Sequence, residues 1–413
     1  VEAGDTKPTL VVCPASLVYN WTAELERFAP SLDVCAIVGA KAQRRVQIAG
    51  VAEHNVVVTS YDLMRRDIDE YAGQDFARVV LDEAQYIKNP LTQVARAAKR
   101  LPAGVRFALT GTPIENRLSE LWSIFDFLMP GLLGTRESFA KRFESPVEHA
   151  EGDSAARLQA LVSPFVLRRV KEDVVADLPE KIEDTVMAQL TGEQRKLYLA
   201  NQDRIAQQVQ HREASEFKKD KLKVLAELIK LRQICCDPRL HYEDYKAGSA
   251  KLDTCMELVY GALDGGHRIL LFSQFTGMLD IIGKRLAKED IAFLKLTGAS
   301  SKESRAKMVA QFQAGEVPVF LISLKAGGVG LNLTAADVVI HYDPWWNVAA
   351  QDQATDRAHR IGQQHTVTVY KLIAKDTIEE RIMQMQESKR DLVNSVLGGD
   401  GISSVLFTRE DVL

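Results

Sequence analysis

The sequence predicts an α/β fold with two parallel sheets, and three observations lead to this prediction. In residues 1–117, short apolar runs alternate with amphipathic segments, a pattern typical of parallel strands covered by helices on both faces. The same alternation returns from residue 251 onward. Between these two regions, the apolar residues follow helical spacing instead. A chain of 413 residues is long enough for about two to three domains.

Residues 1–117 contain several expected strands, each of them an apolar run bounded by turn or polar residues. Amphipathic segments between the strands are expected to form helices. The strands are expected at residues 9–13, 55–59, 78–81 and 105–109, and the helices at residues 15–28 and 91–101.

The middle of the chain has a different pattern. From residue 118 to residue 240 the sequence reads as long helical stretches, with a weak interruption at residues 145–155. Residues 193–231 are rich in Gln, Lys, Glu and Ala, with apolar residues at helical spacing. We therefore expect residues 118–250 to form a helical insertion together with the linker between the two α/β regions, rather than a third sheet.

The second α/β region is expected over residues 251–375, and a helix at residues 376–397 then begins the C-terminal segment 376–413. The strands are expected at residues 268–272, 292–296, 317–322, 338–342 and 367–372, and the helices at residues 278–289, 301–314 and 347–358.

Composition narrows the class of protein but leaves its function open. With 46% hydrophobic and 26% charged residues, the chain is typical soluble globular material, and no run approaches the length of a membrane span. The five cysteines form no C-x-x-C pair, which fits a reducing, cytoplasmic compartment. The eight histidines show no ligand spacing, so no transition metal is assigned. A net charge of −4 argues weakly against a general nucleic-acid binder, but it permits a local basic cleft.

Two adjacent carboxylates, Asp82 and Glu83, follow one of the expected strands. An apolar run that ends in two carboxylates is the form of a Walker B magnesium site in nucleoside triphosphatases. Asp82 would hold Mg²⁺, and Glu83 would orient and deprotonate the attacking water. The alternative is a strand end with two solvated acids. Gln85 and the block at residues 109–116 favour the nucleotide site.

That block, LTGTPIEN, follows another expected strand. The hydroxyls of Thr110 and Thr112 suit a loop that hydrogen-bonds the Asp82–Glu83 turn and senses phosphate. Thr112 followed by Pro113 is also good chemistry for the first residues of a helix. Both interpretations can hold at once.

Two arginines, Arg357 and Arg360, lie three residues apart in QDQATDRAHRIGQ and would share one face of a helix. An arginine that reaches across a cleft stabilises charge in phosphoryl transfer, although charged residues on a helix are more often simply solvated. A phosphate loop of the form G-x-x-x-x-G-K-[ST] is missing from the sequence. The only Gly-Lys pair is Gly283–Lys284, and an arginine follows it.

Two adjacent tryptophans, Trp345 and Trp346, follow a glycine-rich loop at residues 323–332, which is a weak signal by itself. Side chains of an extended segment alternate, so both tryptophans cannot enter one core. We expect one of them at a surface or interface, where it can stack or wedge, with packing under a loop as the alternative. Basic residues at 167–171 and 218–232 are usually explained as solvated helix faces.

The order of these blocks resembles that of the Swi/Snf-type (sucrose-nonfermenting) family of DNA-dependent ATPases, within helicase superfamily two. The resemblance covers nearly the whole chain and implies two RecA-like lobes, a helical protrusion and a C-terminal brace helix. The compact insertion is similar to that of bacterial members. The resembling blocks are residues 9–21, 57–62, 82–85, 109–116, 165–173, 178–181, 269–276, 320–334, 343–347 and 351–363.

The resemblance implies ATP and Mg²⁺ as cofactors and double-stranded DNA as the partner, with protein bound on that DNA as cargo and no membrane. Such proteins move along one strand of the duplex, usually without separating the strands, and here would act in the cytoplasm on the nucleoid. The implied catalytic residues are Asp82, Glu83, Gln85, Arg357 and Arg360. The implied nucleotide-binding residues are Asp82, which also holds the metal, Thr110, Thr112, Gly328, Gly330, Arg357 and Arg360. The implied DNA-binding residues are Ser16, Trp21, Ser60, Arg168, Arg169, Ser273, Gln274, Thr297, Ser323, Lys325 and Trp346.

The sequence departs from the family pattern in one respect. The family's phosphate loop and its adenine-reading glutamine would precede Val1, so we expect this chain to be part of a longer protein, called below the full-length protein. By itself the chain is expected to hydrolyse no ATP above background. The alternative to a motor is a non-hydrolysing DNA-binding or scaffold module on the same fold.

Overall fold

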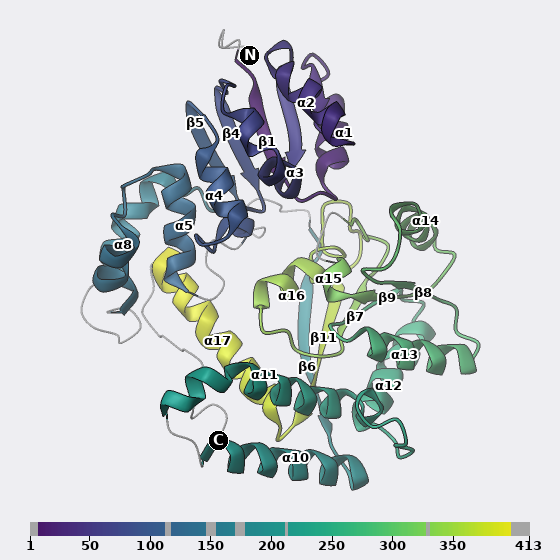
Figure 1. Cartoon of the computed structure of the whole chain (residues 1–413). Helices are drawn as coiled ribbons and strands as arrows, with labels where there is room; N and C mark the ends of the chain where they lie inside the picture. The colour runs from purple at the N-terminus through teal and green to yellow at the C-terminus, as the bar shows by residue number, and fades with distance from the viewer. Residues whose placement is uncertain are drawn as a thin grey trace. The chain divides into compact units, whose positions relative to one another are not determined.

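The computed structural model describes residues 7–111, 117–145, 154–169, 178–210, 214–327 and 331–397. Figure 1 shows its ribbon. The chain forms two compact units: Val1–Phe165 belong to lobe one, and Val166–Arg390 belong to lobe two. Among the described residues, no helix is both long and apolar enough to cross a membrane.

Lobe one contains a five-stranded sheet in the order β2-β3-β1-β4-β5. All its strand pairs are parallel, so the carboxyl ends of the strands meet at one edge. The four strands expected from the sequence are confirmed, and β2 is an addition. The strands are β1 (Thr9–Cys13), β2 (Val34–Ala36), β3 (Val56–Ser60), β4 (Arg78–Asp82) and β5 (Val105–Leu109).

Helices cover both faces of this sheet because successive side chains of a strand point to opposite faces. In β1, Leu10 and Val12 enter one apolar cluster, whereas Val11 and Cys13 enter another, which includes Val18 of α1. The α-helices of lobe one are α1 (Val18–Phe28), α2 (Lys41–Ala49), α3 (Tyr61–Arg66), α4 (Gln93–Arg100), α5 (Leu118–Leu128), α6 (Arg136–Phe139) and α8 (Ser154–Val162).

Lobe two contains a six-stranded parallel sheet in the order β6-β11-β10-β7-β9-β8. It also has two apolar faces, because Ile269 and Leu271 of β7 enter one cluster and Leu270 and Phe272 enter the other. The strands are β6 (Lys181–Gln189), β7 (Ile269–Ser273), β8 (Phe293–Leu296), β9 (Val319–Ser323), β10 (Val338–His341) and β11 (Val367–Lys375).

Strand β6 corrects one expectation. It lies inside the region expected to be helical, yet it pairs with β11 along its whole length, from Lys181 opposite Val367 to Gln189 opposite Lys375. β6 is the edge strand and its residues are mostly exposed, so its sequence carries no apolar alternation. Its stability comes from the ladder to β11 and from ion pairs such as Lys371–Glu183. The separation of residues 118–250 as a domain stays a prediction.

The helices of lobe two follow the same logic, and Figure 1 shows α10 and α11 beside the start of α17. These three helices share one apolar cluster. The buried Lys251 of α12 and the buried Glu379 of α17 form an ion pair of 2.5 Å, which ties these helices together. The α-helices are α10 (Gly192–Gln210), α11 (Ala214–Cys236), α12 (Ala250–Asp264), α13 (Thr276–Lys288), α14 (Lys302–Gln313), α15 (Leu324–Gly327), α16 (Val348–Thr355) and α17 (Ile378–Leu397), which belongs to lobe two as far as Arg390.

Candidate nucleotide and DNA sites

Asp82, at the carboxyl end of β4, is held by three neighbours. Its Oδ2 accepts a hydrogen bond of 2.8 Å from the indole nitrogen of Trp21, and its Oδ1 accepts one of 2.9 Å from the main-chain N–H of Glu83. The hydroxyl of Tyr61 donates to the main-chain oxygen of Asp82 across 2.9 Å. Burial and then the charge of Asp82 raise the pKa of the nearby Cys13 thiol to about 12, so that thiol stays protonated. The hydrogen bonds from Trp21 and from the N–H of Glu83 fix the orientation of the Asp82 carboxylate.

This donor set fits a magnesium ion. Each carboxylate oxygen has two lone pairs, and each oxygen of Asp82 uses only one of them in the bonds above. Mg²⁺ keeps several waters and commonly takes only one or two carboxylates from the protein. One oriented carboxylate at a strand end therefore satisfies what this metal requires of the chain.

Glu83 adopts a left-handed backbone conformation with φ of 53° and ψ of 53°. For a residue other than glycine, this conformation costs about 1–2 kcal/mol, and such outliers cluster at functional sites. Its Oε2 accepts a hydrogen bond of 2.6 Å from Nε2 of Gln85, and Oε1 of Gln85 accepts one of 2.9 Å from the hydroxyl of Thr110. Thr110 directly follows β5. A bonded chain therefore joins Glu83, Gln85 and Thr110 across two neighbouring strand ends.

The other site residues predicted in lobe one differ in their exposure and in their contacts. Ser16 is exposed just beyond β1, whereas Ser60 is buried and caps α3 by accepting a hydrogen bond from the N–H of Leu63. The polar atom of Trp21 faces Asp82, as described above. Thr112 lies outside the described residues. The DNA contacts predicted for this lobe stay predictions.

In lobe two, the predicted DNA-binding residues gather at the carboxyl edge of the sheet. Ser273 and Ser323 end β7 and β9 and are paired in register, and Thr297 follows β8. The hydroxyl of Ser273 donates to Oδ1 of Asp343 across 2.5 Å, and both serines are almost fully buried. Gln274 follows Ser273, and its N–H also points to Asp343, at 3.3 Å. Their hydroxyls and amides are thus in place at one edge.

Three other predicted contacts of lobe two are only partly defined. Arg168 and Arg169 are exposed in an irregular segment after residue 165. Lys325 lies in α15, but its side chain is outside the described part of the chain, as are Gly328 and Gly330.

The two tryptophans separate as expected from strand alternation. Both are half-buried, and Trp345 packs against the cluster that contains Phe272, whereas Trp346 packs against the cluster of α10 and α11. Neither lies fully inside one core. A role for Trp346 at DNA stays a prediction.

The expectation that Arg357 and Arg360 share one face of a helix was wrong. Helix α16 ends at Thr355, and both arginines lie in the turns that follow. The side-chain amide of Gln363 holds this turn because its Nε2 donates to the main-chain oxygen of Ala358 and to those of two residues near β10. In this turn, Arg357 is buried at 7% exposure, whereas Arg360 is exposed.

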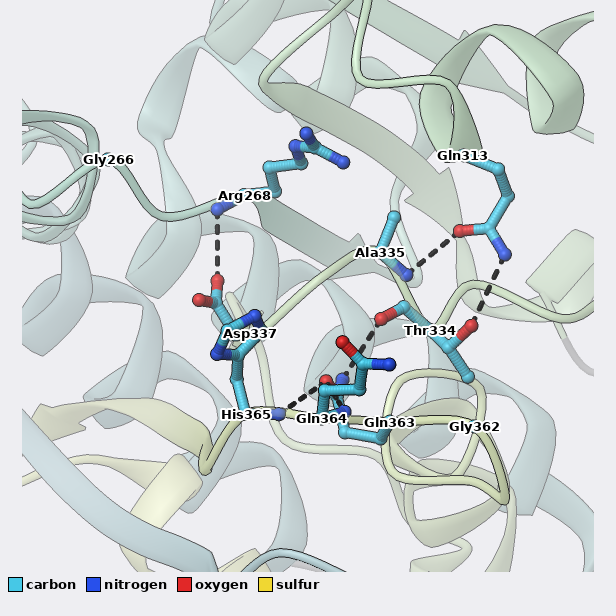
Figure 2. A pocket seen from close by; sticks show the side chains of 10 residues that line it. All are labelled: Gly266, Arg268, Gln313, Thr334, Ala335, Asp337, Gly362, Gln363, Gln364 and His365. Atoms are coloured by element: carbon cyan, nitrogen blue, oxygen red, sulfur yellow. Dashed lines mark hydrogen bonds between the residues drawn. The ribbon is translucent and has the colours of Figure 1, made fainter.

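A polar pocket of about 370 Å³ lies at the opposite edge of the lobe-two sheet, where the strands begin (Figure 2). Its wall includes Arg268 before β7, Asp337 before β10 and His365 before β11. Gln313, also in the wall, donates to the hydroxyl of Thr334 and accepts from the N–H of Ala335. Sequence reasoning did not find this pocket, and it contains none of the predicted nucleotide or DNA residues.

Comparison with known proteins gives the family. Residues 2–240 match the SNF2-related domain, and residues 250–362 match the helicase conserved C-terminal domain. A Mycoplasma pneumoniae protein described as an ATP-dependent helicase is 39% identical over 98% of this chain and 39% of its own length. A Bacillus subtilis protein described as an ATP-dependent helicase/translocase is 40% identical over 99% of this chain and 45% of its own length. The chain thus spans less than half of the length of these relatives.

Among solved structures, the SWI2/SNF2 ATPase core of Sulfolobus solfataricus in complex with double-stranded DNA is 37% identical to this chain. The likeness covers 95% of this chain and 82% of that one, with a TM-score of 0.46. Because the SNF2-related domain alone matches more than half of the residues, the chain belongs to the SNF2 family of ATP-dependent helicases.

Proposed function

We propose that the chain is the core of an ATP-dependent translocase for double-stranded DNA, which couples ATP hydrolysis to movement along the duplex. The observation that carries the proposal is the bonded chain of Glu83, Gln85 and Thr110 beside the oriented carboxylate of Asp82. An exposed acidic strand end would not need these bonds. A hydrolytic site needs them because it must hold a base and a metal ligand in fixed geometry.

In this proposal, Asp82 binds Mg²⁺, which neutralises charge on the phosphates when ATP is bound. Glu83 orients the attacking water and accepts its proton. Gln85 holds Glu83, and Thr110 holds Gln85, so a shift at the end of β5 is transmitted to the base. Hydrolysis and the conformation of lobe one are thereby coupled.

Lobe two supplies the remaining charge. In this proposal, Arg357, Arg360, Gly328 and Gly330 also contact the nucleotide, as does Thr112 of lobe one. Exposed Arg360 is free to reach a phosphate without unfolding its surroundings, which suits a transition-state contact. Buried Arg357 suits a supporting role in the same turn.

In this proposal, DNA contacts the carboxyl edge of the lobe-two sheet. It also contacts the residues predicted for DNA in lobe one, Ser16, Trp21 and Ser60. Hydroxyls, amides and a few cations contact phosphates without reading bases, so binding is independent of sequence and falls steeply with salt. A motor that advances along a duplex meets whatever protein is bound there, so DNA-bound protein is the proposed cargo. The proposed place of action is the cytoplasm, on the nucleoid.

The sequence contains no phosphate loop, and backbone N–H groups with a lysine provide most of the binding to β- and γ-phosphates. We therefore expect residues 1–413 alone to bind duplex weakly and to hydrolyse no ATP above background. The rival function, a non-hydrolysing scaffold, predicts the same result for residues 1–413. The full-length protein is needed to separate the two.

The test measures ATP turnover by the full-length protein with duplex, with single-stranded DNA of the same sequence and without DNA. A translocase for duplex gives turnover that the duplex stimulates many-fold. Turnover at background under all three conditions supports the scaffold instead. Stimulation by single strands alone would contradict the proposed substrate.

A further inference from the structure

Arg232, near the C-terminal end of α11, contacts residues of the proposed DNA-binding edge of lobe two. Its side chain is 1% exposed, so it does not itself meet a ligand. Nη1 donates a hydrogen bond of 3.1 Å to Oε1 of Gln274, and Nη2 donates to the main-chain oxygen of Pro344. The buried carboxylate of Asp343 lies 3.8 Å from Nη2. These contacts join α11 to the two segments that follow strands β7 and β10 of the sheet.

The same guanidinium also lies against aromatic rings. Its central carbon is 5.2 Å from the centroid of the Trp346 ring and 5.7 Å from that of Phe275. At these distances a guanidinium is attracted to the ring face. One buried side chain therefore contacts two residues of the proposed DNA surface, Gln274 and Trp346, from below.

The contact with Gln274 fixes which end of its amide is available. A guanidinium can only donate hydrogen bonds, so it binds the oxygen of the amide and leaves Nε2 for another partner. Nε2 of Gln274 is buried and makes no hydrogen bond within the described residues. A phosphate oxygen can only accept. In this orientation, the next partner that the amide of Gln274 can take is a hydrogen-bond acceptor, such as a phosphate oxygen.

We infer that Arg232 is a positioning residue for duplex binding, which presets both the amide of Gln274 and the ring of Trp346. The inference rests on the proposed function of this edge. Side chains held in their binding conformation lose less freedom when a ligand binds, so affinity rises without a new contact. Arg232 also makes this surface depend on α11, a helix of lobe two that precedes β7 in the sequence.

A double-mutant cycle on residues 1–413 tests the inference. The dissociation constant for a short duplex is measured at fixed salt for Arg232→Lys, Gln274→Met and the double variant. We expect each single variant to weaken binding by about fivefold, and the double variant to be no more than about twofold weaker than Gln274→Met. If the fold-losses of duplex affinity in the two single variants multiplied in the double variant, the inference would be overturned, because Arg232 would then act independently of Gln274.

Arg232→Lys keeps a positive charge beside Asp343 but loses the planar fork. The matched control is Arg239→Lys, just beyond the same helix, where the guanidinium donates from Nε and Nη2 to Asp237 and touches neither Gln274 nor Trp346. This control should keep the duplex affinity. If Arg239→Lys lost as much duplex affinity as Arg232→Lys, the inference would be overturned, because any arginine change in this segment would then weaken binding.

Tryptophan emission provides a second readout. Arg232→Lys should shift the emission spectrum, and the shift should vanish in a Trp346→Phe background.

If circular dichroism shows that Arg232→Lys does not fold, the affinity of Gln274→Met for the duplex decides, because that variant leaves the Arg232–Asp343 pair intact. Full affinity of Gln274→Met overturns the inference. Unchanged affinity in both Gln274→Met and Trp346→Phe would overturn the proposed DNA surface itself. Loss in these two with none in a folded Arg232→Lys would overturn only the role of Arg232.

Discussion

The indole nitrogen of Trp21, in α1, donates a 2.8 Å hydrogen bond to Oδ2 of Asp82, 61 residues away in the sequence. Family resemblance assigns Trp21 to DNA, whereas its polar atom lies on the carboxylate proposed to hold Mg²⁺. Groups that hydrogen-bond a metal ligand orient it and tune its affinity for the metal. The contact therefore links α1 to the proposed metal site, and this role can be separated from DNA binding by experiment.

The change Trp21→Phe removes this N–H and keeps most of the aromatic packing. In the full-length protein, we expect the Mg²⁺ concentration for half-maximal ATP turnover to rise by about tenfold, while the duplex affinity stays the same. Trp122→Phe is the matched control. The indole of Trp122, in α5, donates its hydrogen bond to the main-chain oxygen of Gly134 and not to Asp82. Weaker duplex binding with an unchanged Mg²⁺ requirement would assign Trp21 to DNA instead.

The change Glu83→Gln removes the proposed base but leaves an amide oxygen that can still accept from Gln85. We expect ATP binding by the full-length protein to persist and turnover to fall by about two decades or more. Glu24→Gln, on the exposed side of α1, should have no effect. Turnover near the wild-type rate in Glu83→Gln would remove Glu83 from the mechanism.

The change Arg360→Ala should lower kcat of the full-length protein by about three decades, with little effect on duplex affinity. Its side chain is exposed, so the fold should keep its thermal stability. Arg357→Ala should lower both the activity and the melting temperature, because that side chain is buried. If Arg360→Ala lost duplex binding and kept turnover, the arginine would be a DNA contact.

Stability should depend on pH through His341, at the end of β10. Burial, and then the charge of Lys371, lower the pKa of His341 to about 3, and Nε2 lies 2.8 Å from the hydroxyl of Thr355. The unfolded chain binds this proton near pH 6.5, so stability is complete above that pH and is lost as pH falls toward 3. The loss from His341 between pH 7 and pH 5 is about 2 kcal/mol.

Denaturant unfolding at both pH values measures this loss. His341→Asn should make the free energy of unfolding less dependent on pH by that amount. An unchanged pH dependence in His341→Asn would show that the histidine does not titrate on unfolding.

The sequence pattern predicted the strands whose own residues form a clear apolar run, but not the elements that depend on contacts with residues far along the chain. The buried strands β1 and β3 have continuous apolar runs, so their positions could be read from the sequence. β6 could not, because its stability depends on a partner strand more than 170 residues later. The end of α16 before Arg357 could not be predicted either, since Gln363 fixes that turn through main-chain oxygens that only the folded chain brings together.

The candidate site divides in the same way. Asp82, Glu83, Gln85 and Thr110 are close in sequence to strand ends, and their types suggested the chemistry before any geometry. Arg232 gave no such signal, because it lies among other basic residues of a helix. Its contacts with Gln274 and Pro344 lie 42 and 112 residues away, so only the structure reveals them.

Displacement of a third strand from a triplex tests the central claim, that ATP hydrolysis by Glu83 moves the protein along duplex DNA. An oligonucleotide bound in the major groove far from the loading end is released only when a motor arrives. With the full-length protein and ATP, we expect release that is delayed in proportion to the length of duplex travelled, and no release with Glu83→Gln. No release by the wild-type protein while duplex-stimulated turnover continues would contradict translocation, and equal release by Glu83→Gln would contradict the assigned catalytic base.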